Sequence, residues 1–196
     1  MENILSQSKL SSPLQVLGGG GDFLDPEAVV DHLDIHPGMR IADFGSGSGY
    51  LTILFAQRVG DLGVVTGIDI MEAPLETLRS KASQLNLQNI RTFRGNLEVR
   101  GGSGLSDESQ DMTVLANILF QNEDKAGIIR EAKRTLKPEG ILVVIDWKKN
   151  GASFGPPNEY RTDPQAMSSI VTEQNFVFQK EIDAGNYHYG FIFKKV

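Results

Sequence analysis

Short β-branched runs alternate with helical stretches along most of this chain, and no other feature of the sequence restricts the fold as strongly. The runs lie at residues 40–44, 64–70, 90–93, 112–116 and 141–147, with helical stretches at about 49–59, 73–86 and 122–137. Strands that alternate with helices at this spacing form right-handed βαβ units around a parallel sheet. The wholly apolar run 141–145 predicts a central strand that is covered on both faces.

Local signals place the ends of several elements. Asp25 and Pro26 predict a helix start, because aspartate caps free amides and proline fits the first helical position. Pro138 is expected to end the third long helix at Lys137. Near the C-terminus, strand-like runs at 176–182 and 187–193 flank a short turn, which predicts a closing antiparallel pair.

Composition narrows the class of protein. The 196 residues suit one domain, which we expect over residues 25–196, and the polar residues 1–24, with four glycines near their end, are expected to form a flexible arm. The absence of cysteine excludes disulfides, a thiolate nucleophile and a cysteine-built metal site. A net charge of -6 argues against non-specific binding to a phosphate backbone.

The sequence shows neither an apolar run of membrane-spanning length nor a signal peptide. Its longest apolar run, 141–145, is far shorter than the roughly 18 residues that a membrane span requires. The first residues lack a basic start followed by an apolar stretch, so no signal peptide is visible. We therefore expect a cytoplasmic protein without a membrane span.

The turn after the first strand carries the strongest functional signal. Asp43 is followed by Gly45, Gly47 and Gly49, and a helix is predicted to begin directly after them. Glycine lets the backbone turn sharply and lets a ligand approach, and the helix start offers free amides. About 20 residues further on, Asp69 ends the second strand, where an acid can accept hydrogen bonds from ribose hydroxyls. Each feature alone fits tight packing or a cap, but together they predict a nucleoside-binding crevice.

The spacing of the glycines distinguishes between two ligands. Dinucleotide sites prefer Gly-x-Gly-x-x-Gly, whereas this loop reads Gly-x-Gly-x-Gly and is preceded by Asp43. An acid in front of the glycines repels a pyrophosphate and attracts an ammonium group. The loop therefore favours S-adenosylmethionine over NAD.

This loop resembles the first motif of the class I S-adenosylmethionine-dependent methyltransferases, and the likeness extends from about Asp25 to Val196. Residues 111–117 are similar to the fourth strand of that family, and residues 130–140 to the helix, turn and glycine before its fifth strand. The resemblance implies an α/β, Rossmann-like, doubly wound seven-stranded mixed sheet with an antiparallel last strand and helices on both faces. It also implies S-adenosylmethionine as cofactor and methyl transfer as activity.

The resemblance further implies roles for single residues. Asp43 is expected to face the methionyl ammonium, directly or through water, and Asp69 to hold the ribose hydroxyls. Asn96 stands where many members carry an acid at the adenine edge. The cofactor-binding residues implied in this way are Asp43, Gly45, Ser46, Gly47, Gly49, Asp69, Ile70, Met71, Asn96, Leu97 and Asn117. No metal site is predicted.

Few side chains qualify as catalytic groups, and a base is required only if the acceptor must lose a proton. His188 in the last strand is the best candidate by chemistry, although strand alternation favours a solvent-facing position. Asp146 and Trp147 end the fifth strand, and Trp147 is expected either to wall the acceptor site or to pack at the strand end. His32 and His36 are expected at the surface.

The acceptor is only partly restricted by the sequence. Arsenite methyltransferases resemble this core but bind arsenic through cysteines, and nucleic-acid amino-methylating enzymes often carry Asn-Pro-Pro where this chain reads Asn117-Ile118-Leu119. The chain resembles most the broad group that includes quinone-biosynthesis methyltransferases. A small-molecule acceptor is favoured, a protein or RNA acceptor stays open, and the loop 148–161 is expected to border the acceptor pocket.

Two other functions remain as alternatives. The first is a non-catalytic S-adenosylmethionine-binding module or partner subunit, which the scarcity of catalytic side chains suggests. The second is an NAD-linked oxidoreductase, against which the glycine spacing argues. The sequence predicts no oligomeric state.

Overall fold

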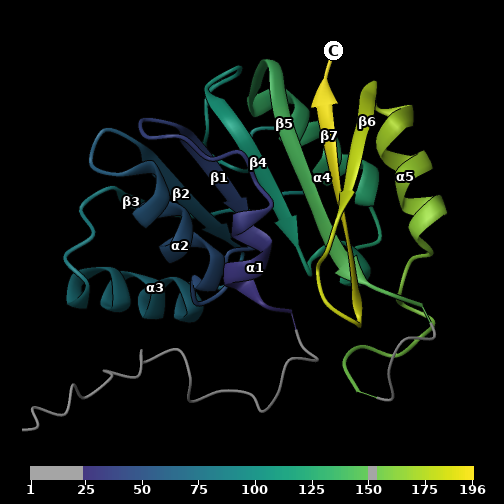
Figure 1. Cartoon of the computed structure of the whole chain (residues 1–196), viewed down its shortest axis with the longest axis horizontal. Helices are drawn as coiled ribbons and strands as arrows, with labels where there is room; N and C mark the ends of the chain where they lie inside the picture. Colours follow the sequence, from purple (N-terminus) through teal and green to yellow (C-terminus); the bar gives the residue numbers. More distant parts are fainter. Residues whose placement is uncertain (1–23, 150–153) are drawn as a thin grey trace, which may run out of the picture.

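A computed structural model of the chain describes residues 24–149 and 154–196, which form a seven-stranded sheet flanked by helices (Figure 1). The elements are α1 (Pro26–Asp31), β1 (Arg40–Phe44), α2 (Tyr50–Val59), β2 (Val64–Asp69), α3 (Glu72–Gln84), β3 (Ile90–Arg94), β4 (Gln110–Ala116), the 3₁₀ helix η2 (Leu119–Gln121), α4 (Lys125–Thr135), β5 (Leu136–Trp147), α5 (Pro164–Glu173), β6 (Phe176–Ile182) and β7 (His188–Lys195).

The strand order is β3-β2-β1-β4-β5-β7-β6. The neighbours from β3 to β5 are parallel, whereas β7 runs antiparallel to both β5 and β6. The predicted mixed sheet with an antiparallel last strand is therefore confirmed. After β1 the chain adds β2 and β3 on one side of that strand and then crosses to add β4 on its other side. A topological switch point therefore lies between β1 and β4, where open α/β sheets bind ligands.

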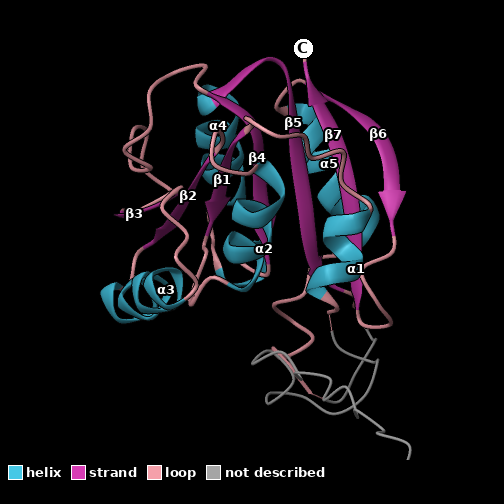
Figure 2. Ribbon diagram, turned by 60° about the vertical axis from the view of Figure 1, so that its left-hand side comes forward, coloured by secondary structure: helices cyan, strands magenta, loops and turns pink. Residues whose placement is uncertain are grey.

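Helices cover both faces of the sheet, as predicted (Figure 2). Along β5, Leu142 and Val144 belong to the core shared with α4 and α5, whereas Val143 and Ile145 belong to the core shared with α1 and α2. All four side chains are fully buried. The apolar run 141–145 is thus a central strand, and the period of two sends successive side chains to opposite faces.

The end of α4 differs from the prediction. The helix stops at Thr135 rather than Lys137, and Leu136 already has extended backbone and begins β5. A residue that precedes proline is pushed toward extended conformations, which disfavours helix at Lys137. Leu136 is also fully buried beneath the sheet's α4 face, so an early exit from the helix places its side chain in the core.

The helix α5 is absent from the predicted elements, although Asp163 and Pro164 repeat the start signal of Asp25 and Pro26. The Asp163 carboxylate accepts hydrogen bonds from the amides of Gln165 and Ala166. The polar connection 96–110 contains turns and no helix. The buried Glu131 holds it, because its carboxylate accepts the amides of Gly101 and Ser103.

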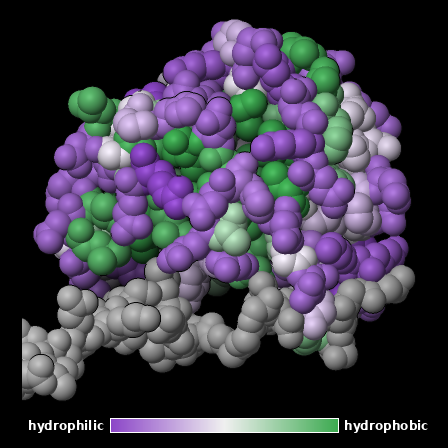
Figure 3. All heavy atoms as spheres, in the orientation of Figure 1, coloured by the Kyte–Doolittle hydropathy of each residue, from purple (hydrophilic) through white to green (hydrophobic). Residues whose placement is uncertain are grey.

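The predicted arm falls almost wholly outside the described residues, and both its flexibility and the single-domain boundary stay predictions. Among the described residues, no helix is long and apolar enough to cross a membrane. The face seen in Figure 3 is largely hydrophilic, with apolar side chains scattered among the polar ones.

Candidate functional site

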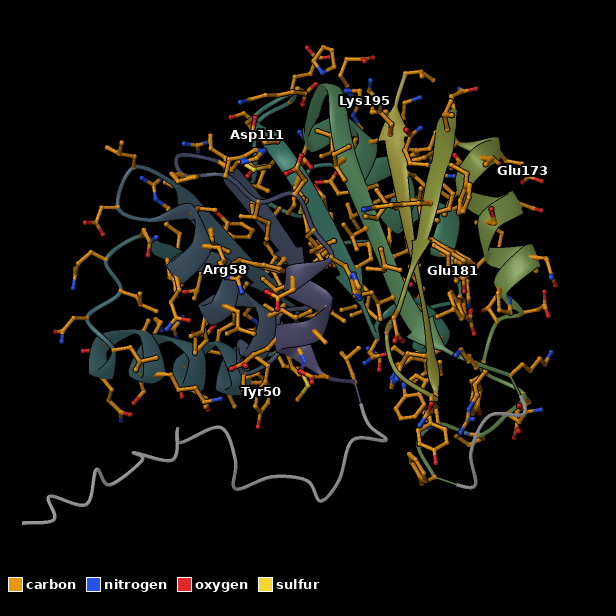
Figure 4. All side chains as sticks on the ribbon, viewed as in Figure 1. Tyr50, Arg58, Asp111, Glu173, Glu181 and Lys195 are labelled. Carbon is orange, nitrogen blue, oxygen red and sulfur yellow. The ribbon has the colours of Figure 1, made fainter. Side chains whose placement is uncertain are left out.

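The carboxyl ends of β1, β2, β4 and β5 meet at one edge of the sheet, and the loops that follow them build the site. After β1, the amides of Gly45 and Ser46 both donate to the Ile68 carbonyl of β2, at 2.7 and 3.0 Å. These bonds fold the glycine loop across the neighbouring strand. Figure 4 shows Tyr50, where α2 begins after the loop, at this edge, and Asp111 of β4 at the opposite one.

Two of the loop glycines are required by space as well as by backbone conformation. Gly45 and Gly49 have φ of +76° and +83°. A Cβ at Gly45 would lie 2.0 Å from Ile118, and one at Gly49 would lie 2.2 Å from Leu78. Gly47 also has positive φ, but a Cβ there meets nothing within 4 Å, so the loop is open on this side. The loop is therefore a cradle that leaves room for a ligand at Gly47.

Asp69 lies against this open part of the loop. Its Oδ2 accepts the amide of Gly47 at 3.0 Å, and its Oδ1 accepts the amide of Met71 at 2.9 Å. Ile70 and Met71, which directly follow, are about 60% exposed, at 59% and 60%. Large apolar side chains left this exposed beside a polar crevice suit contact with a flat ligand. The carboxylate and the two apolar side chains thus lie together at the open part of the loop, and their expected contacts with the cofactor stay predictions.

Asp43 lies beneath the loop and is 2% exposed. The Thr52 hydroxyl in α2 donates to its Oδ2 at 2.5 Å. Burial raises the pKa of Asp43 to about 6, the hydrogen bond from Thr52 lowers it, and the charge of Asp69 raises it further. The structure places Asp43 at the start of the loop with almost no exposure, and its contact with the methionyl ammonium, directly or through water, stays a prediction.

Two buried oxygen atoms at the site lack a hydrogen-bond partner among the described residues: Ser46 Oγ in the loop and Asn117 Oδ1 after β4. Asn117 has a φ of +56°, and its amide donates to the Ile145 carbonyl at 2.9 Å. Buried polar atoms are nearly always satisfied in native proteins. The unpartnered Ser46 oxygen, with the open cradle and the two carboxylates, fits the amino-acid and ribose groups of S-adenosylmethionine.

Asn96 and Leu97 differ in their exposure to solvent. Leu97 is buried beside Phe44 and Ile68, whereas Asn96 is exposed. The Asn96 side-chain oxygen accepts the amide of Glu98 at 3.0 Å, so it caps a turn in this structure. Its role at the adenine edge stays a prediction.

A cavity of about 690 Å³ opens next to the glycine loop, at the ends of β4 and β5. Asn117 lines this cavity, and Ile118, which follows it, packs against Gly45 of the glycine loop. Trp147 forms part of the wall, as one of the two expectations for it states, and residues of the loop 148–161 contribute as well. The lining residues are Asn117, Phe120, Gln121, Trp147, Pro156, Pro157 and Tyr160.

The other two catalytic candidates do not line this cavity. Asp146 is 1% exposed and accepts the amides of Phe120 and Trp147 at 2.9 and 2.8 Å, although burial raises its pKa to about 6. His188 is 1% exposed rather than solvent-facing, because it packs on Trp147, the residue with which it pairs in β5. Its ring lies 4.2 Å from that of Trp147 between centroids. His32 and His36 are exposed, as expected.

Several residues of the site are missing from the sequence-based prediction. Thr52 holds Asp43, and Phe120 and Gln121 line the cavity from η2. Arg161, only 4% exposed, donates to the carbonyls of Phe154 and Pro156. Thr52 follows the glycine loop closely, and η2 follows a strand at the ligand-binding edge, so position relative to the strands is the signal that could have found them.

This fold, with an acidic glycine loop after β1 and an acid at the end of β2, defines a class I S-adenosylmethionine-dependent methyltransferase. The chain belongs to the family described as a methyltransferase domain, whose model matches residues 35–191.

Curated relatives match part of their length. The ubiquinone/menaquinone biosynthesis C-methyltransferase UbiE of Shewanella sediminis is 31% identical over 121 residues, 61% of this chain and 47% of that protein. The human arsenite methyltransferase is 32% identical over 128 residues, 62% of this chain and 33% of that protein. The chain thus spans about half the length, or less, of these relatives.

Solved structures agree on the fold. A SAM-dependent methyltransferase from Aquifex aeolicus superposes with a TM-score of 0.81 at 26% identity and covers 89% of this chain and 91% of that one. The [4+2]-cyclase SpnF superposes with a TM-score of 0.74 at 15% identity over 87% of this chain and 80% of that one, which shows a shared fold alone.

Proposed function

We propose that this chain is an S-adenosylmethionine-dependent methyltransferase that acts on a small-molecule acceptor. The observation that carries the proposal is the cradle at Gly47, which is open to a ligand and flanked by the carboxylates of Asp43 and Asp69. Membership of the methyltransferase-domain family and the likeness to the Aquifex aeolicus enzyme support it. The cytoplasmic location stays a prediction.

Different residues of the crevice are expected to contact different parts of the cofactor. The bound cofactor supplies an electrophilic methyl group, whose transfer leaves the electron pair of the broken bond on sulfur. Asp43 supplies negative charge for the ammonium end, and Asp69 supplies acceptor oxygens for the ribose hydroxyls. Asn117 lines the cavity and precedes Ile118, which packs against the glycine loop, so we expect its free carbonyl oxygen to lie between donor and acceptor.

The cavity offers no ordinary general base among its described lining residues, which are aromatic, amide and proline side chains. Methyl transfer from a sulfonium needs positioning first, and effective molarities of about 10⁵ M or more come from orientation alone. The lining suits an acceptor that is already nucleophilic or that releases its proton to water.

Calorimetric titration with S-adenosylhomocysteine, with NAD as the control ligand, tests the proposal. We expect binding of the first alone, and Asp69→Ala to weaken it by about tenfold or more because a charge-assisted hydrogen-bond acceptor is lost. Asp61→Ala, an exposed aspartate in the turn before β2, is the matched control. Unchanged affinity in Asp69→Ala would remove the ribose role, and NAD binding alone would favour an oxidoreductase.

The formation of S-adenosylhomocysteine distinguishes a methyltransferase from the alternative, a non-catalytic binder. A methyltransferase releases S-adenosylhomocysteine in proportion to acceptor methylated, whereas a binding module or partner subunit retains the cofactor unchanged. The buried positions of His188 and Asp146 give this alternative its motivation.

A further inference from the structure

The cavity beside the glycine loop has an uncharged wall. None of its described lining residues carries a formal charge. Phe120, Trp147 and Tyr160 supply aromatic surface, and Asn117 and Gln121 supply amide groups that can both donate and accept hydrogen bonds. This composition differs from the surface of a chain in which 22% of the residues are charged.

Three cationic side chains that lie close to the lining residues in the sequence, Lys125, Lys148 and Arg161, donate to backbone carbonyls. Lys125 donates its Nζ to the Asn122 carbonyl at 2.8 Å, and Lys148 donates to the Gly185 carbonyl at 3.2 Å. Arg161 lies 5.3 Å from the centre of the Trp147 ring, on which its guanidinium is placed. It also donates from Nε, Nη1 and Nη2 to the carbonyl oxygens of Pro156, Lys148 and Phe154, so these three bonds hold the guanidinium on the backbone.

Asp146 and His188, which adjoin Trp147, also make contacts within the protein. Both oxygens of Asp146 accept backbone amides, at the ends of η2 and β5. The His188 ring lies against Trp147, and burial together with Lys148 and Arg161 lowers its pKa to about 4. His188 is therefore neutral at physiological pH. A charged acceptor entering this cavity would lose hydration without gaining an ion pair from the described lining residues, which is costly.

We propose that the acceptor is an electrically neutral ring compound whose polar substituent bonds to the amides of Asn117 and Gln121. This inference rests on the proposed function and specifies its substrate class. Flat apolar faces meet Trp147 and Phe120, where ring–ring contacts add to the burial of area. The orphaned Oδ1 of Asn117 accepts the hydrogen of a hydroxyl or N–H group on the ring.

Three probes of nearly equal shape test the effect of charge, and a fourth probe tests the need for a ring. Tyrosol is neutral, tyramine is its ammonium counterpart and 4-hydroxyphenylacetate its carboxylate counterpart, and 1-hexanol is a neutral probe without a ring. Trp147 is the sole tryptophan of the chain, so its fluorescence reports on the cavity directly. The titrations use the full chain saturated with S-adenosylhomocysteine. We expect tyrosol to change the fluorescence saturably and to bind about tenfold more tightly than either charged probe.

A charge added to the wall should reverse the preference. Gln121→Glu should strengthen tyramine binding and weaken tyrosol binding, since the new carboxylate pairs with the ammonium group. Gln57→Glu makes the same chemical change on the exposed face of α2 and should leave all affinities unchanged. Thermal melts of both variants check that they fold.

The outcomes separate this inference from the proposed function. Binding of a charged probe as tightly as tyrosol, binding of 1-hexanol as tightly as tyrosol, or no saturable change with any probe overturns the substrate class. The proposed function stands in these cases if calorimetry of the same sample shows S-adenosylhomocysteine binding. If S-adenosylhomocysteine fails to bind, the proposed function falls whatever the probes do, and the substrate class falls with it.

Discussion

The carboxylate of Asp43 is buried, which we expect to favour binding of a cationic ligand group and to lower the stability of the fold. It is buried with Thr52 as its hydrogen-bond donor and with the carboxylate of Asp69 nearby, so its charge is poorly solvated in the protein without a ligand. A cationic ligand group would relieve this state. Groups with shifted pKa values concentrate at functional sites for this reason.

We expect Asp43→Asn to raise the free energy of unfolding at neutral pH and to weaken S-adenosylmethionine binding. The rise in pKa from 3.8 to about 6 corresponds to about 3 kcal/mol, and a gain of about 1 to 3 kcal/mol is expected because asparagine keeps an acceptor for Thr52. Between these two pKa values, the folded protein retains a proton that the unfolded chain releases. Stability therefore falls as pH rises from about 4 to 6.

Urea unfolding at several pH values measures this effect. The advantage of Asp43→Asn should be absent below about pH 4 and complete above about pH 6. The exposed Asp61→Asn provides the control, with no such pH dependence expected. A variant that is less stable than the parent at neutral pH would show that the Asp43 charge already has a stabilising partner.

Single residues could be predicted where the backbone itself dictates them. Gly45 and Gly49 combine positive φ with neighbours that exclude a Cβ, so their spacing is visible in the sequence. His188 could not be placed from its own strand, because its burial comes from Trp147 of the neighbouring strand β5. Long-range pairing, unlike a turn, leaves little trace in the local sequence.

At the scale of elements, Arg161 holds the described residues between β5 and α5 in place. The buried guanidinium donates to the carbonyls of Lys148, Phe154 and Pro156 and lies over Trp147. One side chain thus fixes the part of the chain that contributes Pro156 and Tyr160 to the cavity.

Arg161→Ala should expose Trp147, which is 7% exposed in the protein, to solvent. We expect stronger quenching of its fluorescence by acrylamide and a loss of about 2 kcal/mol of stability, since several charge-assisted hydrogen bonds disappear. Arg161→Lys should restore little, because one ammonium cannot replace a planar fork of donors.

Binding of S-adenosylhomocysteine should be nearly unchanged in Arg161→Ala, because the glycine loop lies on other strands. Arg91→Ala, on the exposed edge strand β3, serves as the matched control. If quenching stays at the parental level, the segment is held by other contacts and Arg161 does not position the cavity wall.

Elements were predictable where one local pattern dominates. Local sequence predicts the continuous apolar run of β5 and the hairpin of β6 and β7. It also predicts the strand–glycine–helix sequence at α2. The helix α5 carries a start signal but mixes small, polar and apolar residues, and only Met167 and Val171 are buried. Its stability depends on packing against the sheet, which periodicity alone does not reveal.

At the scale of the whole molecule, the strand order joins three distant segments into one site. Residues 45–52, 69–71 and 117–121 follow β1, β2 and β4, which are neighbours in the sheet. The outer strand β6 lies at the far edge, beyond β7. A ligand in the crevice should therefore stabilise the three segments together and leave β6 unaffected.

Hydrogen exchange with and without S-adenosylhomocysteine measures this coupling. We expect slower exchange at residues 45–52, 69–71 and 117–121, because ligand contacts hold these loops closed, and unchanged exchange at Phe176–Ile182 of β6. Asp69→Ala should abolish the change in all three segments at a ligand concentration that saturates the parent. Slower exchange confined to the loop after β1 would show that β4 does not border the ligand, and Asn117 would then lose its place between donor and acceptor. Equal slowing across the entire sheet, β6 included, would instead indicate that the ligand stabilises the fold globally, because the exchanging amides then open only when the whole molecule unfolds.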